Sequence, residues 1–270
     1  MKYSIRDLFN KICEYEGDKV YQNLIFPWAE NSNYKEFIIT ISNKLNLTKE
    51  ENWELYALSR VLDILTLKFQ PNNNSDHSNW TGPQLTINEF NDFVKYLGLE
   101  INFPKKYEAY NCEILESIEG NENFEIIDCL FPSVKLGKLL IKRSGVIITN
   151  KITDYNLDLI NNSILYWAYR RKNKGYRDLS QGWGSNSQWT TEFRLDYETD
   201  EMYIFNLNGK FDLNELSEDT LTELDQQNLE INEAIEILTN RNFIKCKKDD
   251  DDLYPYDFKY SIKKTTPNTR

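Results

Sequence analysis

Residues 86–118 read Thr86-Ile-Asn-Glu-Phe-Asn-Asp-Phe-Val-Lys-Tyr-Leu97-Gly-Leu-Glu-Ile-Asn-Phe-Pro-Lys-Lys106-Tyr-Glu-Ala-Tyr-Asn-Cys-Glu113-Ile-Leu-Glu-Ser-Ile118, and their hydrophobic pattern changes near Lys106. Up to Leu97 the apolar residues recur at helical spacing, whereas the later segments are short runs of Ile, Leu, Val and Phe between Gly and Pro. This change predicts an α+β fold, in which a helical N-terminal region packs on a mostly antiparallel sheet and a C-terminal helix closes the structure.

Helices are predicted by apolar spacing together with capping residues. In the longest segment, Thr48 is a candidate N-cap, and Glu50 and Glu51 occupy the first turn, where the helix dipole favours acidic side chains. Asn228 is a candidate break in the last segment. The predicted helical segments are 4–15, 33–45, 48–69, 86–97, 154–162 and 214–238.

Strands are predicted for the short apolar runs after Lys106, and Ser144-Gly145 is expected to form a tight turn between two strands of an antiparallel meander. Residues 188–196 alternate between apolar and polar side chains, and they should form a hairpin with residues 202–207. The remaining predicted strands are 113–118, 124–131, 135–142, 145–149 and 164–171. Residues 1–106 and 107–270 are the two candidate domains, and one continuous domain is the alternative.

Composition limits the classes of function. The net charge of −11 argues against nucleic acid as a general partner, because binding to phosphates relies on Lys and Arg, and it favours a basic protein partner. The N-terminal residues contain neither a signal peptide nor a membrane anchor, and the four dispersed cysteines favour reduced thiols. We therefore expect a cytoplasmic protein without a membrane partner.

Charge is unevenly distributed along the chain. Residues 134–177 contain ten Lys or Arg against two Asp, a net charge of +8, and we interpret them first as a solvated face. Residues 198–258 contain seventeen Asp or Glu against five Lys or Arg, a net charge of −12. The basic and aromatic residues 166–177 could bind single-stranded nucleic acid, but we favour the interpretation that the arginines at 170, 171 and 177 are neutralised inside the protein by carboxylates such as Glu192 and Asp196.

The segment Tyr176–Tyr197 lies between the two charged blocks and is rich in side chains suited to recognition. A structural role, with the Trp rings anchoring a long loop, is as well supported as a binding role. Trp189 should be buried, because it shares a face with Phe193 and Leu195, whereas Trp183 lies between two glycines and is the better contact residue. The candidate binding residues are Trp183, Asn186, Arg177, Arg194, Arg170 and Gln188.

The sequence offers little support for a catalytic mechanism. His77, the only histidine, lies in a polar loop, and no glycine-rich nucleotide-binding motif is present. We assign no metal ligands and expect no cofactor. Carboxylate chemistry is the alternative, with Asp178, Glu192 and Asp196 as candidate catalytic residues near the loop.

Two functions follow from these observations. The first is an acidic cytosolic protein-binding module, such as a bacterial immunity or antitoxin-like protein that occludes a basic toxin, and we expect it not to be an enzyme. Its acidic charge and its abundance of Asn, Lys and Ile support this hypothesis. The second is a carboxylate-dependent hydrolase with its site at the Trp183–Trp189 loop.

Overall fold

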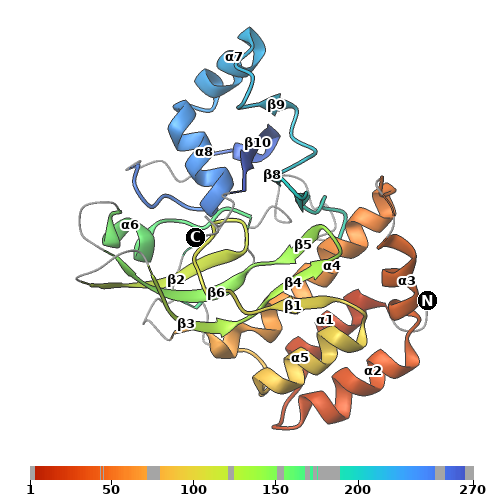
Figure 1. Ribbon diagram of the computed structural model, residues 1–270. Coiled ribbons are helices and arrows are strands. Elements are labelled where there is room, and N and C mark those ends of the chain that lie inside the picture. The colour runs from red at the N-terminus through yellow and green to blue at the C-terminus, as the bar shows by residue number, and fades with distance from the viewer. Residues whose placement is uncertain are drawn as a thin grey trace.

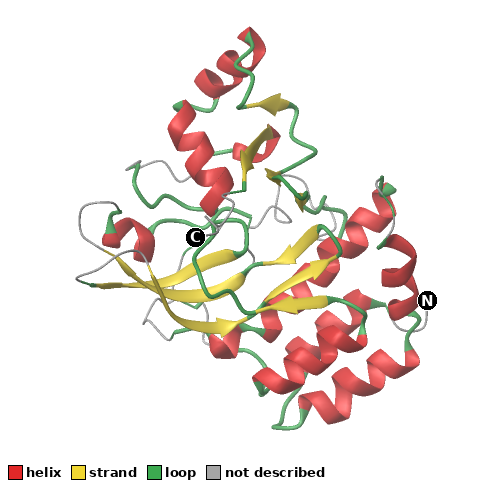
Figure 2. Cartoon of the chain, viewed as in Figure 1, coloured by secondary structure: helices red, strands yellow, loops and turns green. Residues whose placement is uncertain are grey.

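The computed structural model describes residues 4–42, 44, 46–71, 80–120, 125–150, 155–167, 171–172, 175, 189–246 and 253–264. These residues form an α+β fold with a mostly antiparallel mixed sheet, which confirms the predicted class (Figures 1 and 2). The N-terminal helices gather on one side of the strands, and α7 and α8 lie at the opposite end of the view (Figure 1). None of the described helices is long and apolar enough to cross a membrane.

The N-terminal helices begin at residues that the capping signals predict. Ser4 accepts a hydrogen bond from the backbone N–H of Asp7, and Thr48 forms a reciprocal capping box with Glu51. The sequence prediction missed the helical residues 21–31, which begin as a π-helical turn. The helices are α1 (Ile5–Glu14), α2 (Phe26–Asn31), α3 (Tyr34–Ile41), α4 (Lys49–Leu65) and α5 (Ile87–Tyr96).

The strands form two sheets in the described part of the chain. One has the order β1-β4-β5-β7-β8-β10-β9 and is antiparallel except between β10 and β9, and the other has the order β2-β6-β3. The strands are β1 (Glu100–Asn102), β2 (Cys112–Glu119), β3 (Glu125–Phe131), β4 (Ser133–Leu136), β5 (Leu139–Lys142), β6 (Ser144–Asn150), β7 (Asp196–Glu198), β8 (Met202–Phe205), β9 (Phe211–Asp212) and β10 (Phe258–Lys263).

The predicted meander is wrong in two respects. Residues 135–142 do not form one strand, because a turn at Gly137, whose φ is +55°, separates β4 from β5. Ser144 and Gly145 form no turn and instead begin β6, which pairs in parallel with β2 and antiparallel with β3. The prediction failed because sequence proximity does not determine which strands become neighbours.

Two other predicted strands are wrong. Residues 164–171 form no strand in their described part, since Trp167 has a φ of 56° that interrupts an extended chain. Of the described residues 189–196 only Asp196 is in a strand: the Asn52 side chain hydrogen-bonds both backbone groups of Phe193 and thereby replaces a neighbouring strand. The hairpin itself is confirmed, because β7 pairs antiparallel with β8.

The C-terminal part contains α6 (Leu157–Asn162), α7 (Glu218–Gln226) and α8 (Ile231–Asn240). Asn228 has a φ of 51° and lies between α7 and α8, which confirms the predicted break. The prediction missed β10, which pairs with both β8 and β9. α8 and β10 share a hydrophobic cluster that includes Ala234, Ile237 and Phe258.

The largest hydrophobic core lies between the N-terminal helices and the main sheet. Its buried members come from α1 to α5 and also from β4 and β5, including Val134 and Ile141. Trp189 is half-buried against this core, with its ring 5.2 Å from that of Phe9, so it packs on the core as expected but is not fully enclosed. No disulfide joins the four cysteines, all of which are described.

Candidate functional site

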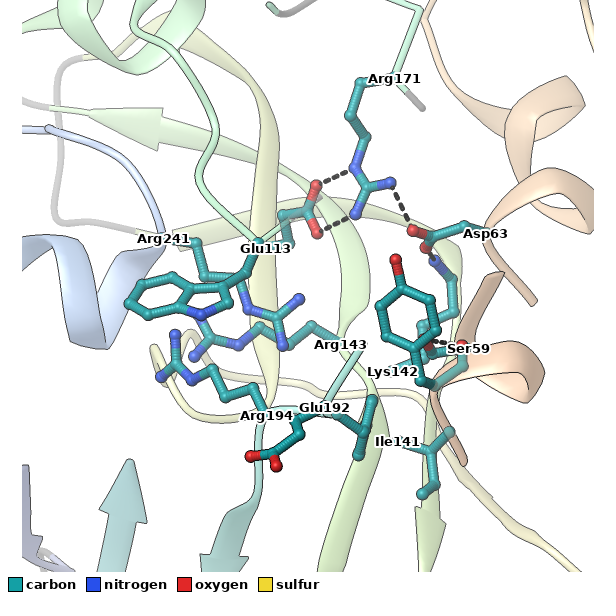
Figure 3. Close-up of a pocket in the computed structure, with 13 residues that line it drawn as sticks. Ser59, Asp63, Glu113, Ile141, Lys142, Arg143, Arg171, Glu192, Arg194 and Arg241 are labelled. Atoms are coloured by element: carbon teal, nitrogen blue, oxygen red, sulfur yellow. Dashed lines mark hydrogen bonds and ion pairs between the residues drawn. The ribbon is translucent and has the colours of Figure 1, made fainter. Parts of the chain in front are cut away.

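A pocket lined by charged side chains lies where α4, β2, β5 and the segments preceding β7 and following α8 meet (Figure 3). It encloses a cavity of about 40 Å³. Buried charged groups are costly unless they are paired, so a concentration of them indicates either internal ion pairs or a ligand. The lining residues are Tyr56, Ser59, Asp63, Glu113, Ile141, Lys142, Arg143, Trp167, Arg171, Glu192, Phe193, Arg194 and Arg241.

One half of the pocket is a balanced ion-pair network. Arg171 binds Glu113 through two hydrogen bonds of 2.5 and 2.9 Å, and its Nη1 lies 3.1 Å from Asp63 Oδ2. Lys142 donates to the other oxygen of Asp63. Burial alone would raise the pKa of Glu113, but the charge and hydrogen bonds of Arg171 outweigh it and lower the pKa to about 2. Two cations and two carboxylates neutralise one another here.

The other half holds three arginines around one carboxylate, that of Asp196. Arg194 Nε donates to Asp196 Oδ1 at 2.7 Å, while Arg143 Nη2 and Arg241 Nη2 lie 3.5 and 3.8 Å from Oδ2. Asp196 itself is only 1% exposed. Backbone carbonyls at the end of α8 accept two further bonds, from Arg143 to Thr239 and from Arg194 to Leu238. Three positive charges therefore share one negative charge.

Each of these arginines has one buried side-chain nitrogen that finds no acceptor among the described residues. The atoms are Arg143 Nε, Arg194 Nη1 and Arg241 Nε. Burial, together with the positive charge of neighbouring arginines, lowers the pKa of Arg194 and of Arg241 to about 10, although Asp196 acts in the opposite direction. The unused donors, together with three guanidinium groups beside one carboxylate, indicate that positive charge exceeds negative charge among the described residues of this half of the pocket.

Backbone strain concentrates at the same place. Four non-glycine residues in the described chain have positive φ, and three of them belong to this cluster: Trp167, Asn206 and Arg241. The backbone N–H of Asn206 donates to Asp196, and the Trp167 ring covers the Arg194 guanidinium at 4.4 Å. The left-handed region is unfavourable for Trp and Arg, and such strain is typical of functional sites.

Only Arg194, Glu192 and Asp196 of the predicted site residues are among the described residues. Arg194 is in the cationic half of the pocket, with Asp196 as its counter-ion, and Glu192 lines the pocket with its side chain exposed. Glu192 and Asp196 do not share a strand face as predicted, because β7 begins only at Asp196. The predicted residues Arg170, Arg177, Asp178, Trp183, Asn186 and Gln188 lie outside the described residues.

Sequence reasoning missed the other charged groups of the pocket. The basic residues 134–177 were interpreted first as a solvated face, but Lys142, Arg143 and Arg171 are buried. The prediction that carboxylates inside the protein neutralise Arg171 is confirmed. Its partners, however, are Asp63 and Glu113 and not Glu192 and Asp196. Two signals were available: Asp63 interrupts the apolar stripe of α4, and Lys142-Arg143 ends an apolar run.

The arrangement can bind an anion, but it offers poor conditions for acid catalysis. A general acid needs a carboxyl group with a raised pKa, whereas ion pairing outweighs the effect of burial and lowers the pKa of Asp63, Glu113 and Asp196. No group of three or more His, Cys, Asp or Glu suited to a metal ion occurs among the described residues.

Comparison of the chain with protein-family models, with curated proteins and with solved structures finds no match.

Proposed function

We propose that this protein binds a small anionic ligand through Arg143, Arg194 and Arg241. The observation that carries the proposal is the sharing of one buried carboxylate by three buried guanidinium groups. An anion in the cavity would accept the unused N–H groups and balance the excess charge. Removing a partner from a buried charge costs about 3–5 kcal/mol, so a cluster that lacks partners gains stability from a ligand.

Binding is better supported than carboxylate-dependent hydrolysis, which was the alternative. Asp196 is surrounded by arginines that keep it ionised, so it serves as a counter-ion and not as a proton donor. The cavity of about 40 Å³ also accommodates one small group only. A hydrolase would need a second carboxyl group at the reacting bond with a pKa suited to proton transfer.

The proposal can be tested with phosphate and sulfate as probes. Each anion should raise the melting temperature of the wild-type protein, because a ligand that binds only the folded state stabilises it by mass action. Arg241→Gln should remove most of this increase. Arg6→Gln is the matched control, since it removes the same charge from an arginine on α1 that pairs with Glu54. Sulfate also stabilises proteins without binding a site. Equal increases in the wild-type protein and Arg241→Gln would contradict the proposal.

Binding of a basic protein partner is a second candidate, favoured by the surface around α7. Residues 212–240 contain nine Asp or Glu and no Lys or Arg. Leu216 and Leu221 are 47% and 44% exposed within this acidic segment. Exposed apolar side chains surrounded by one sign of charge suit a partner with basic and apolar residues. An immunity or antitoxin-like protein of the cytoplasm could use this surface to occlude a basic toxin.

This second candidate can be tested with a synthetic helical peptide built from Lys and Leu. The wild-type protein should bind it with an affinity that falls at high salt. The double substitution Leu216→Ser/Leu221→Ser should weaken binding at least about tenfold, a typical effect of losing central apolar contacts. Ile39→Ser is the control, because Ile39 is 54% exposed on α3. Equal affinity of the double variant and the control would exclude this surface.

A further inference from the structure

We infer that the arginine pocket selects a dianionic tetrahedral oxyanion, a phosphoryl or sulfate group, over a monoanionic carboxylate; this inference rests on the proposed function. Within the described part of the chain, Arg143, Arg194 and Arg241 face the single carboxylate of Asp196, which leaves an excess of two positive charges. A dianion neutralises this excess, whereas a carboxylate would leave one buried charge unbalanced.

The neighbouring charges do not alter this count. Asp63 and Glu113 are matched by Lys142 and Arg171 in the other half of the pocket. Glu192 lines the pocket, but its side chain is exposed, so water screens its charge. The Thr239 and Leu238 carbonyl groups are uncharged and already accept hydrogen bonds from Arg143 and Arg194. Counted over the residues that the structure describes, the excess of two positive charges therefore remains.

The unused donors also favour a tetrahedral group. A planar carboxylate is bound best by one guanidinium group that offers two parallel N–H bonds. Here Asp196 and backbone carbonyls already occupy parts of the guanidinium groups, and on three separate arginines one buried nitrogen has no acceptor among the described residues: Arg143 Nε, Arg194 Nη1 and Arg241 Nε. A phosphoryl group carries three strong acceptor oxygens, which suits donor nitrogens on three separate side chains.

The three side chains come from different parts of the chain and gather on one side of the pocket. Arg143 lies between β5 and β6, Arg194 precedes β7, and Arg241 is the C-cap of α8. Figure 3 shows them together, apart from the network of Arg171, Glu113 and Asp63. Because the cavity of about 40 Å³ is small, it suits the oxyanion itself, either as a free ion or as the terminal group of a larger ligand.

Calorimetric titration of the wild-type protein with four probes tests the selectivity. The probes are sodium sulfate, inorganic phosphate, glycerol 2-phosphate and sodium acetate, first at pH 8. We expect the three dianions to bind at least about tenfold more tightly than acetate. Glycerol 2-phosphate binding tighter than inorganic phosphate would support a phosphorylated ligand, and equal affinities would support the free ion.

A second titration at pH 5 separates the charge of the ligand from that of the protein. A phosphate monoester has a second pKa of about 6, so it should bind roughly tenfold more weakly at pH 5 than at pH 8. Sulfate remains a dianion, so its affinity should change little. Because sulfate keeps its charge, a change in its affinity would report titration of the protein. The titratable groups that line the pocket are Tyr56, Asp63, Glu113, Lys142, Arg143, Arg171, Glu192, Arg194 and Arg241, and Asp196 lies beside them.

The outcomes distinguish the two proposals. Acetate binding as tightly as sulfate would overturn the selectivity for dianions and leave anion binding standing. Failure of all four probes to bind the wild-type protein would overturn both proposals. Sulfate binding with equal affinity to the wild-type protein and Arg241→Gln would show that the anion binds elsewhere, which also overturns both. The comparison of probes uses only the wild-type protein, so it does not depend on the folding of a variant.

Discussion

Glu113 shows how strongly a single buried residue depends on its partner. Its carboxylate is enclosed on β2 and accepts both hydrogen bonds of an Arg171 fork. Such a pair contributes little compared with an apolar substitute, but losing one member leaves an unpaired buried charge. Next to this pair, the Lys172 backbone N–H donates to the side-chain oxygen of Gln70, which lies in the segment that follows α4.

The pKa of Glu113 predicts a specific loss of stability in acid. Arg171 lowers it from 4.5 to about 2, so the stabilisation is fully present above pH 4.5 and is lost as the pH falls toward 2. A shift of this size corresponds to about 3 kcal/mol. Glu113→Gln should therefore be less stable than the wild-type protein at pH 7, and the difference should shrink steadily between pH 4.5 and pH 2.

Urea unfolding of both proteins across this pH range measures the difference. Glu201→Gln is the control, because Glu201 is exposed, and it should stay within about 0.5 kcal/mol of the wild-type protein. If the free energies of unfolding of Glu113→Gln and the wild-type protein differed by the same amount at every pH, Arg171 would not lower the pKa of Glu113.

At the scale of elements, β6 shows why the predicted turn at Gly145 was wrong. The strand lies between β2 and β3. Its Gly145 is needed because neighbouring side chains leave no room for a larger residue, and not because the chain turns there. A Cβ atom at position 145 would lie 2.3 Å from the Phe131 ring and 2.6 Å from the Leu115 side chain. The absence of a side chain allows these two buried residues to cover the strand.

Gly145→Ala should consequently destabilise the protein by about 3 kcal/mol, at the upper end of the cost of overpacking a core. Gly175→Ala is a matched control, because its Cβ atom would meet only Ile164 at an ordinary 3.7 Å. Thermal and urea unfolding of the two variants should differ clearly. Similar stabilities would mean that Phe131 and Leu115 can move aside without cost.

At the scale of the whole molecule, the N-terminal helices and the strands share one core. Val134 and Leu136 of β4 and Leu139 and Ile141 of β5 are buried against the helices. The side chain of Asn52 on α4 holds the backbone of Phe193, 141 positions along the sequence. These contacts favour one continuous domain over two separate domains.

We therefore expect residues 1–106 not to fold when produced alone, because the apolar faces of their helices would lose the sheet that covers them. Circular dichroism should show no cooperative thermal transition for this fragment, whereas the full chain unfolds cooperatively. A sigmoidal transition with dispersed amide resonances in the fragment would establish residues 1–106 as an independent domain.

The sequence by itself determined the α+β class and most helices of the N-terminal half. Thr48 caps the helix that it was expected to cap, Ser4 and Thr86 cap the helices whose predicted segments begin at them, and Asn228 separates the last two helices. These features were predictable because capping and helical spacing act between residues three or four positions apart. The hairpin of β7 and β8 was predictable for the same reason, since its strands are joined by a short turn.

Only the tertiary structure decided the parallel pairing of β2 with β6 and the composition of the arginine pocket. Arg143, Arg194 and Arg241 are far apart in sequence, although all three surround Asp196. Asp63 and Glu113, which pair with Lys142 and Arg171 in the other half of the pocket, are equally distant from one another in sequence. A hydrophobic pattern does not show whether an arginine in a polar segment is solvated or buried. Burial of a charge depends on partners that the fold brings from elsewhere, so local residue types could locate Arg194 but not the site.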